Sequence, residues 1–462
     1  MMSLNPVMPG EGPFVPSEPG DLAFQRWLQD SQWLSPATHL EHSLAMVHRL
    51  LVHAHRTVPF HRARIDEAGI DVAQPLTLAS WRRLPVLKRV DVQQSVDALF
   101  SNAVPPEHGE VLSNTSSGST GIPVTVRGTT FDAWIFKAFN LRHYLWHPHD
   151  FTGKVAIIRQ VKEGHARYPS VALYERWADT ATLPFATGPA AELSIHTSIC
   201  EQAEWLVRQD PDYLVSYPSN VMALARHFRD SGMHLPHLEQ VETLGEVVNP
   251  ELRVLVRTVF DAPIVDAYSA QEVGVIADQC PDTEGYHVAA ETIFVEVLDE
   301  EGAPCSPGQT GRVVVTPLFN YAQPLIRYQL GDYAVVGSTC ACGRGLPVLE
   351  RVLGRERNAV LVTSTGERYW PAFGSRTFAE IAPVVQHQFV QHEPDWIEAR
   401  LVTQRPITRA EEQKLRERIL ARLPAAFRIT FSYPHEIARN AGGKYENFVS
   451  QMGRTGSSAP TR

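Results

Sequence analysis

The sequence has few cysteines, no membrane-length apolar run and no excess of basic residues. An odd count of five cysteines in 462 residues argues against a disulfide framework. The net charge of -9 disfavours a surface for nucleic acid or anionic membranes, and no apolar stretch approaches membrane-spanning length, so we expect neither partner. Because residues 1–20 lack a basic region followed by an apolar core, we expect a cytoplasmic protein.

The remaining composition is that of a globular chain with two or three domains, since 44% of residues are hydrophobic and 20% are charged. Residues 1–20 and 453–462 are poor in large apolar groups, and we expect both ends to be disordered. Apolar spacing predicts a helix near residues 40–54, and β-rich runs predict strands. These strands are expected at residues 155–158, 264–268, 293–298 and 313–315. The alternation indicates an α/β fold.

A second, smaller unit is expected after Gly354 and Arg355. Its predicted elements are strands near residues 385–390 and 397–402, a helix with Leu415, Ile419, Leu420 and Leu423 on one face, and a strand at 427–431. We therefore expect a large domain over residues 21–354 and a small domain over 355–452, with a hinge near 355–358.

A loop rich in hydroxyls and glycines lies at residues 115–123, before the first of these expected strands. Glycines let backbone N–H groups approach a ligand closely, and Ser and Thr hydroxyls donate to phosphate oxygens. A Walker loop would continue with Gly-Lys-Ser/Thr, whereas this chain has Ile122 and Pro123, so we expect nucleotide binding without a Walker fold. A flexible turn between strands is the alternative. The candidate phosphate-binding residues are Ser116, Ser117, Gly118, Ser119, Thr120 and Gly121.

Three charged residues extend this pattern. Glu272 lies just past an expected strand end, where α/β folds place ligands, and a carboxylate there can hold Mg²⁺ on a triphosphate. Asp332 follows Gly331 and can accept both hydroxyls of a ribose. Lys444, in Gly-Gly-Lys, is one of two lysines after the hinge. Taken singly, a surface acid, a turn former and a solvated lysine are the more ordinary interpretations.

In their order and spacing these segments resemble the adenylate-forming superfamily of acyl-CoA synthetases, peptide synthetase adenylation domains and luciferases. Within it they resemble the phenylacetate–CoA ligase-like branch, which includes capsule-biosynthesis proteins, and the resemblance spans about residues 40 to 448. The matching segments are Ala54 to His61 (helix end), Leu84 to Lys88 (further N-terminal segment), Ser116 to Pro123 (phosphate loop), Leu244-Gly245-Glu246 (adenine-facing turn), Tyr268-Ser269 to Glu272 (aromatic-plus-Glu motif), Tyr328 to Asp332 (ribose motif), Gly354-Arg355 (interdomain motif) and Gly443-Lys444 (mobile lysine). It implies a large multi-sheet N-terminal domain and a small mobile α+β C-terminal domain.

The resemblance also implies a reaction in two steps. A substrate carboxylate attacks the α-phosphate of ATP, pyrophosphate leaves, and a nucleophile then captures the acyl-adenylate. The phosphate loop would hold the β and γ phosphates, Glu272 would anchor Mg²⁺, and Lys444 would bridge the carboxylate and the α-phosphate. Asp332 would bind the ribose, and Arg355 would contact the nucleotide from the linker.

The sequence determines the acceptor and the acid substrate less closely than it determines the adenylation step. Where close relatives have Gly-Arg-Ser-Asp-Asp, this chain has Gly-Arg-Glu-Arg-Asn at residues 354–358, and bulky Tyr369 and Trp370 follow in a segment that lines the pantetheine tunnel of thioester-forming relatives. CoA is the first acceptor considered, with a carrier protein or an amine as alternatives. A catalytically silent nucleotide-binding scaffold is the hypothesis from another class. The oligomeric state is open, with a homodimer as one alternative.

An acyl pocket is expected between the helix after the phosphate loop and the turn at residues 216–219. An aromatic lining favours a flat, aryl acid over a long chain. The same residues at helical spacing are also typical of an ordinary core. The candidates are Trp134, Phe139, His143, Tyr217 and Pro218.

Four further residues form a candidate zinc site. Cys280, His287, Cys340 and Cys342 offer three thiolates and one imidazole, a closed set for tetrahedral Zn²⁺. Because four protein ligands leave no position for water, we expect a structural metal that ties two loops of the large domain. A buried cysteine pair with a surface histidine is the alternative.

Overall fold

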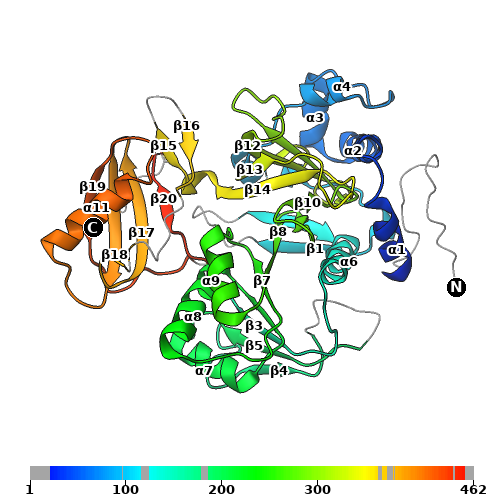
Figure 1. The fold of residues 1–462 in the computed structure, drawn as a ribbon. Helices are drawn as coiled ribbons and strands as arrows, with labels where there is room; N and C mark the ends of the chain where they lie inside the picture. Colours follow the sequence, from blue (N-terminus) through cyan, green and yellow to red (C-terminus); the bar gives the residue numbers. More distant parts are fainter. Residues whose placement is uncertain are drawn as a thin grey trace. The chain divides into compact units, whose positions relative to one another are not determined.

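The computed structural model describes residues 21–95, 97–115, 124–177, 186–362, 367–371, 378, 380–440 and 443–452. The chain forms two compact units (Figure 1). The large unit contains the residues up to Val248 together with Leu252–Val352. The small unit contains Asn249–Glu251 and the residues from Leu353 onward.

Helices dominate the first hundred described residues. The long α2 (Pro36–Thr57) begins where the Ser35 side chain accepts a hydrogen bond from the Thr38 backbone N–H at 3.1 Å. It ends next to Pro59, which opens the following helix. The helix expected over residues 40–54 is therefore confirmed. Its neighbours are α1 (Asp21–Ser31), α3 (Pro59–Glu67), α4 (Leu78–Arg83), α5 (Arg89–Gln94), η1 (Asp97–Leu99) and η2 (Pro106–His108).

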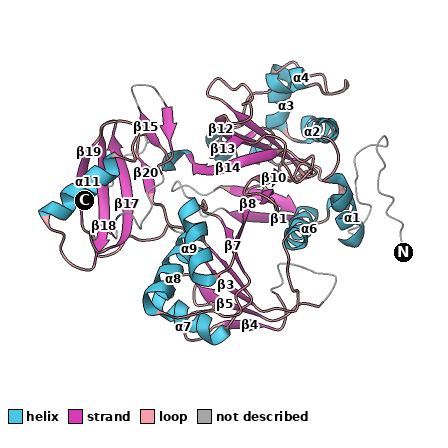
Figure 2. Cartoon of the chain, viewed as in Figure 1, coloured by secondary structure: helices cyan, strands magenta, loops and turns pink. Residues whose placement is uncertain are grey.

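A parallel region of five strands forms the first half of the main sheet. Strands β5, β3, β6, β7 and β8 lie in this order and run parallel, so their carboxyl ends share one edge. Three helices pack beside these strands and bury residues such as Trp205, Phe228 and Val256 (Figure 2). The elements are β3 (Val155–Arg159), β4 (Ala172–Tyr174), β5 (Ala190–Ser194), α7 (Ile199–Gln209), β6 (Tyr213–Ser216), α8 (Pro218–Ser231), β7 (Gln240–Leu244), α9 (Pro250–Phe260) and β8 (Ile264–Ala270).

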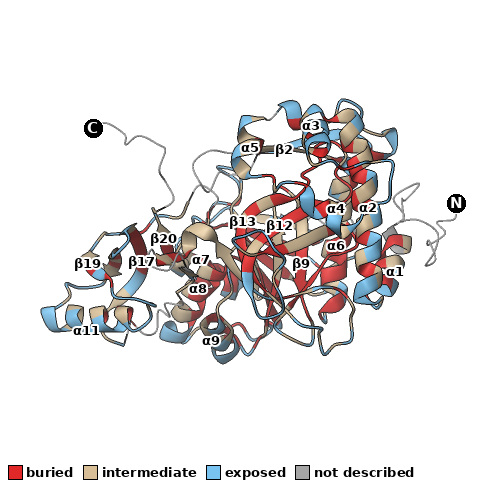
Figure 3. Ribbon diagram, turned by 90° about the horizontal axis from the view of Figure 1, so that it is seen from above, coloured by how far each residue is buried: buried red, intermediate tan, exposed pale blue. Residues whose placement is uncertain are grey.

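The second half of the same sheet is antiparallel and continues past β8. The strand order is β8, β9, β10, β14, β13, β12 and β11, which gives twelve described strands when β4 at the far edge is included. Buried residues concentrate in this region, and α6 (Thr130–Trp146) packs against it (Figure 3). A separate hairpin pairs β1 (Val111–Thr115) with β2 (Thr125–Thr129). The remaining strands are β9 (Gly274–Gln279), β10 (Tyr286–Val288), β11 (Ile293–Leu298), β12 (Thr310–Pro317), β13 (Tyr328–Val336) and β14 (Val348–Arg355).

The small unit has its own four-stranded sheet, in the order β19, β18, β17 and β20. The helix α11 (Arg409–Leu420) buries Leu415 and Ile419 in a core with Phe389 and Phe448. The predicted strand–strand–helix–strand order is confirmed. Its elements are η3 (Glu356–Asn358), β15 (Val360–Val362), β16 (Glu367–Tyr369), β17 (Val384–Glu393), β18 (Trp396–Thr403), β19 (Arg428–Ser432) and β20 (Phe448–Ser450).

The α/β class expected from the sequence is confirmed by this architecture. Within the described ranges, no helix has both the length and the apolar character needed to cross a bilayer.

Candidate active site

Several predicted site residues lie along one edge of the main sheet. Tyr217 and Pro218 follow β6, Gly245 follows β7, and Ser269 lies at the end of β8. These strands are parallel neighbours, so the three segments meet at the carboxyl edge. This is the edge at which open α/β sheets bind ligands.

Glu246 connects two of these segments. Its carboxylate accepts hydrogen bonds from the Ser219 backbone N–H at 2.8 Å and the Ser219 hydroxyl at 3.1 Å. Because Ser219 lies in the first turn of α8, the carboxylate also faces the positive end of the helix dipole. Gly245 precedes it with a φ of +75°, a conformation that favours glycine. The segment expected to face the adenine, which follows β7, is therefore hydrogen-bonded to the start of α8, which follows β6.

Tyr268 and Asp332 meet although their strands are not neighbours. The Tyr268 hydroxyl donates to Asp332 Oδ2 at 2.8 Å, while β8 and β13 are separated in the sheet by β9, β10 and β14. Four strand spacings amount to about 19 Å in a flat sheet, which is beyond the reach of these two side chains. The sheet must therefore curl, as large twisted sheets do. The curl brings the predicted aromatic and ribose motifs together.

Glu272 lies in the connection between β8 and β9 and is ion-paired. Arg89 Nη1 lies 2.9 Å from Glu272 Oε1, with the two side chains 18% and 6% exposed. Arg89 is the first residue of α5 and was not among the predicted site residues. Its only signal was its position directly after Leu84 to Lys88, a segment that resembles the same branch. The candidate metal-binding carboxylate thus has a cationic partner.

The phosphate loop from Ser116 to Pro123 lies outside the described residues. The strands on either side of it are described, and they pair antiparallel with Thr115 opposite Thr125. The assignments of Ser116, Ser117, Gly118, Ser119, Thr120 and Gly121 stay predictions.

The aromatic residues proposed for an acyl pocket take part in packing. Trp134 stacks on Phe131 with ring centroids 5.5 Å apart, and Phe139 is 1% exposed within the main core. The Tyr217 hydroxyl accepts a hydrogen bond from the Gln160 backbone N–H at 3.3 Å. These contacts are typical of core residues, so their role in binding an acid stays a prediction.

His143 belongs to a buried network of charged groups. Its Nδ1 lies 3.2 Å from Asp278 Oδ1. Burial alone would lower the pKa of His143, but the hydrogen bond to Asp278 and the charges of Asp278, Glu242 and Asp266 outweigh burial and raise it. Burial raises the pKa of Asp266 to about 6 despite hydrogen bonds from the hydroxyls of Thr243 and Tyr286. Glu242 and Asp266 lie in the paired strands β7 and β8.

The small unit carries the two remaining candidates. Arg355 ends β14, and its backbone carbonyl accepts a hydrogen bond from Trp370 Nε1 at 3.3 Å. Lys444 lies in a turn closed by Asn440, whose Oδ1 accepts from the Lys444 backbone N–H at 3.1 Å. Both residues stay predicted catalytic groups.

The four candidate zinc ligands converge within the large unit. Cys280 follows β9, His287 lies in β10, and Cys340 and Cys342 lie between β13 and β14. Their ligand atoms all lie within 4.8 Å of one another, including His287 Nε2 and Cys342 Sγ at 3.2 Å. Burial and the nearby Arg344 lower the pKa of His287 to about 4, so the imidazole is neutral and can donate a lone pair. The donor set fits a closed tetrahedral site.

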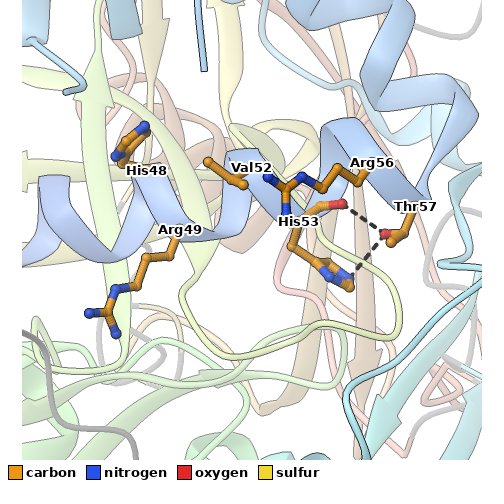
Figure 4. Close-up of a pocket in the computed structure, with 6 residues that line it drawn as sticks. All are labelled: His48, Arg49, Val52, His53, Arg56 and Thr57. Carbon is orange, nitrogen blue, oxygen red and sulfur yellow. Dashed lines mark hydrogen bonds between the residues drawn. The ribbon is translucent and has the colours of Figure 1, made fainter. Parts of the chain in front are cut away.

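A hollow of about 450 Å³ lies elsewhere, beside α2 (Figure 4). His53 bonds there to the hydroxyl of Thr57, four residues along the same helix. The lining contains no predicted site residue and no carboxylate, so the candidate active site stays at the strand edge. The lining residues are His48, Arg49, Val52, His53, Arg56 and Thr57.

The chain is similar to known proteins over both of its units. The model of the CapK C-terminal domain family matches residues 361–451. Phenylacetate-coenzyme A ligase of Thermus thermophilus is 26% identical over 435 residues, which cover 86% of this chain and 93% of that ligase. The enzyme of the same name from Escherichia coli is 24% identical over 68% of this chain and 70% of its own length.

A solved structure has a similar fold over most of the chain. The crystal structure of 2-hydroxyisobutyryl-CoA ligase in its postadenylation state superposes with a TM-score of 0.68, covering 89% of each chain at 19% identity. The resemblance and the fold type expected from the motifs are thereby confirmed. Over most of its length the chain is thus similar in sequence to phenylacetate-coenzyme A ligases and in fold to an acyl-CoA ligase that forms an adenylate.

Proposed function

We propose that the protein activates a carboxylic acid with ATP and passes the acyl group to CoA. The observation that carries this proposal is the convergence at one sheet edge of the turn after β7, the Tyr268–Asp332 pair and Glu272. In this proposal an aryl acid is the first substrate class. Its support is the aromatic character of the segments beside that edge and the phenylacetate-coenzyme A ligases among the relatives.

The proposed first step forms an acyl-adenylate and releases pyrophosphate. Asp332 accepts hydrogen bonds from the ribose hydroxyls, and the Tyr268 hydroxyl fixes the orientation of that carboxylate. The Gly245 turn receives the adenine, and residues 116–121 bind the β and γ phosphates. Lys444 places its ammonium between two anions, the acid and the α-phosphate, and so lowers the repulsion between them.

Mg²⁺ is the proposed cofactor, with Glu272 as its protein ligand. When bound, the metal would neutralise charge that develops on the leaving pyrophosphate. Glu272 fits this role because it is a carboxylate at the strand edge. Its ion pair with Arg89 has to open or be shared when a metal binds, so Arg89 is a second cation available to the phosphates.

Zn²⁺ is proposed at the Cys280, His287, Cys340 and Cys342 cluster. With four protein ligands the metal would have a structural role and would take no part in adenylation. It would tie the β9–β10 connection to the β13–β14 connection.

The test is release of pyrophosphate from MgATP over a panel of carboxylic acids, followed by separate incubations with CoA, a carrier protein and amines. We expect release with at least one aryl acid and thioester formation with CoA. Release with no acid would exclude the ligase and leave a nucleotide-binding scaffold. Release followed by transfer only to the carrier protein or an amine would exclude CoA as the acceptor.

A further inference from the structure

The segment that departs from the hinge sequence of close relatives makes a specific contact in the small unit. Arg357, in the short helix η3, lies with its Nη2 2.6 Å from Glu446 Oε1. Each of the two side chains is 21% exposed, so the pair is largely shielded from water. An ionised donor and acceptor at this distance form a strong, directional hydrogen bond. Glu446 is only two residues beyond Lys444.

Asn358 reinforces the same contact. Its Nδ2 donates to Glu446 Oε1 at 3.2 Å and to the backbone carbonyl of Phe448 at 2.7 Å. Phe448 begins β20, which pairs in parallel with β17 of the small sheet. The residues at 357 and 358 therefore join the hinge segment to the chain directly after the candidate catalytic lysine.

The other side of the lysine turn is closed by Asn440. Its side chain accepts from the Lys444 backbone N–H, its backbone N–H donates to the Lys444 carbonyl at 2.9 Å, and its carbonyl accepts from Gly443 N–H at 2.8 Å. Gly443 has a φ of +73°, which favours glycine in this tight turn. The backbone of Lys444 is thus held from Asn440 on one side and through Glu446 on the other.

We propose that Arg357 and Glu446 are positioning residues that hold the Lys444 turn against the hinge segment. This inference rests on the proposed function, because it assumes that Lys444 acts in adenylation. A lysine on a long flexible stem reaches a reacting pair more often when its backbone is fixed in advance. Arg357 thereby supplies, through Glu446, an anchor for the lysine. In the proposed mechanism Lys444 acts only in adenylation, so thioester formation from a preformed adenylate should not need the anchor.

The experiment measures the two half-reactions separately. Pyrophosphate release reports adenylation, and thioester formation from a synthetic acyl-adenylate and CoA reports the second step. We expect Glu446→Gln and Arg357→Gln each to slow the first half-reaction roughly tenfold, as expected for a misplaced catalytic group, and to leave the second within about twofold. The exchanged pair Arg357→Glu with Glu446→Arg should recover most of the lost rate. Arg405→Gln is the matched control, since it removes a 2.7 Å ion pair with Glu411 elsewhere in the small unit.

Equal slowing of both half-reactions would overturn the proposal, because it would indicate a general structural role. So would an exchanged pair no better than the single variants. Amide hydrogen exchange supplies a readout without activity: Glu446→Gln should speed exchange at residues 443–446, whereas Arg405→Gln should not. If the wild-type chain released no pyrophosphate with any acid, the proposed function would fail, while the exchange result would still decide whether the pair holds the turn.

Discussion

At the scale of single residues, the Arg89–Glu272 pair has the most direct consequence for cofactor binding. Glu272 is 6% exposed, and a carboxylate so deeply buried is costly without a cation. Arg89→Ala removes the arginine cation and leaves Glu272 free to bind Mg²⁺. We expect the variant to melt at a lower temperature without metal and to need roughly fivefold less Mg²⁺ for half-maximal pyrophosphate release.

A magnesium titration and melting curves with and without MgATP test this expectation. Arg159→Ala is the matched control, because it breaks a 2.7 Å pair with Glu192 in another part of the large unit. An unchanged or higher magnesium requirement in Arg89→Ala would show that Glu272 does not bind the metal.

His143 predicts a pH dependence of stability. Its pKa is raised in the folded chain, so the stabilisation is fully present below the unfolded value of about 6.5 and is lost as the pH rises through the higher folded value. His143→Gln should therefore lower the melting temperature more at about pH 6 than at about pH 9. His237→Gln removes a more exposed histidine–aspartate contact and should change little at either pH. An equal fall in the melting temperature of His143→Gln at both pH values would contradict a raised pKa for His143.

Of the Arg89–Glu272 pair, the sequence predicted Glu272 as a site residue and did not predict Arg89, for a physical reason. A carboxylate after a strand is visible in local sequence, which is why Glu272 could be predicted. Arg89 is 183 residues away, and nothing local to α5 specifies which acid it meets. The contact depends on how distant elements pack. In the same way His143 was identified, but its partner Asp278 was not.

At the scale of elements, the cysteine and histidine cluster joins two connections of the antiparallel half-sheet. We expect purified protein to contain about one equivalent of zinc, and Cys340→Ser to lose it and to melt at a lower temperature. Cys200→Ser is the control, since this exposed cysteine lies outside the cluster. Zinc below roughly 0.1 equivalent in chelator-washed wild-type protein would contradict the site.

The strands and helices that were predicted from the sequence are those with strong local signals. The runs at residues 155–158 and 293–298 became β3 and β11, and the periodic run at 40–54 became α2. The curl that unites Tyr268 with Asp332 could not be predicted. It is a cumulative property of five strands, and no single segment encodes it.

At the scale of the whole molecule, the division into two units places Lys444 and Glu272 on different bodies. In the proposed mechanism both residues act on one nucleotide, and Lys444 acts only in adenylation. Lys444→Ala should cost about 3 kcal/mol in the adenylation barrier, roughly a hundredfold in pyrophosphate release. Lys414→Ala, on the exposed face of α11, should have no effect. In Lys444→Ala, thioester formation from a synthetic adenylate should persist. Loss of both half-reactions would contradict a role of Lys444 in adenylation alone.

The contact between Tyr268 and Asp332 also makes the shape of the main sheet part of the binding chemistry. In the sheet, the connection from β8 to β13 passes through β10. This strand is only three residues long and pairs with β14 at Tyr286 and His287. Damage to this short link would flatten the curvature and separate the two side chains without touching either one. Sequence changes around Tyr286 should therefore weaken nucleotide affinity from a distance, and a bound nucleotide should in return protect β8 and β13 from opening as a single cooperative unit.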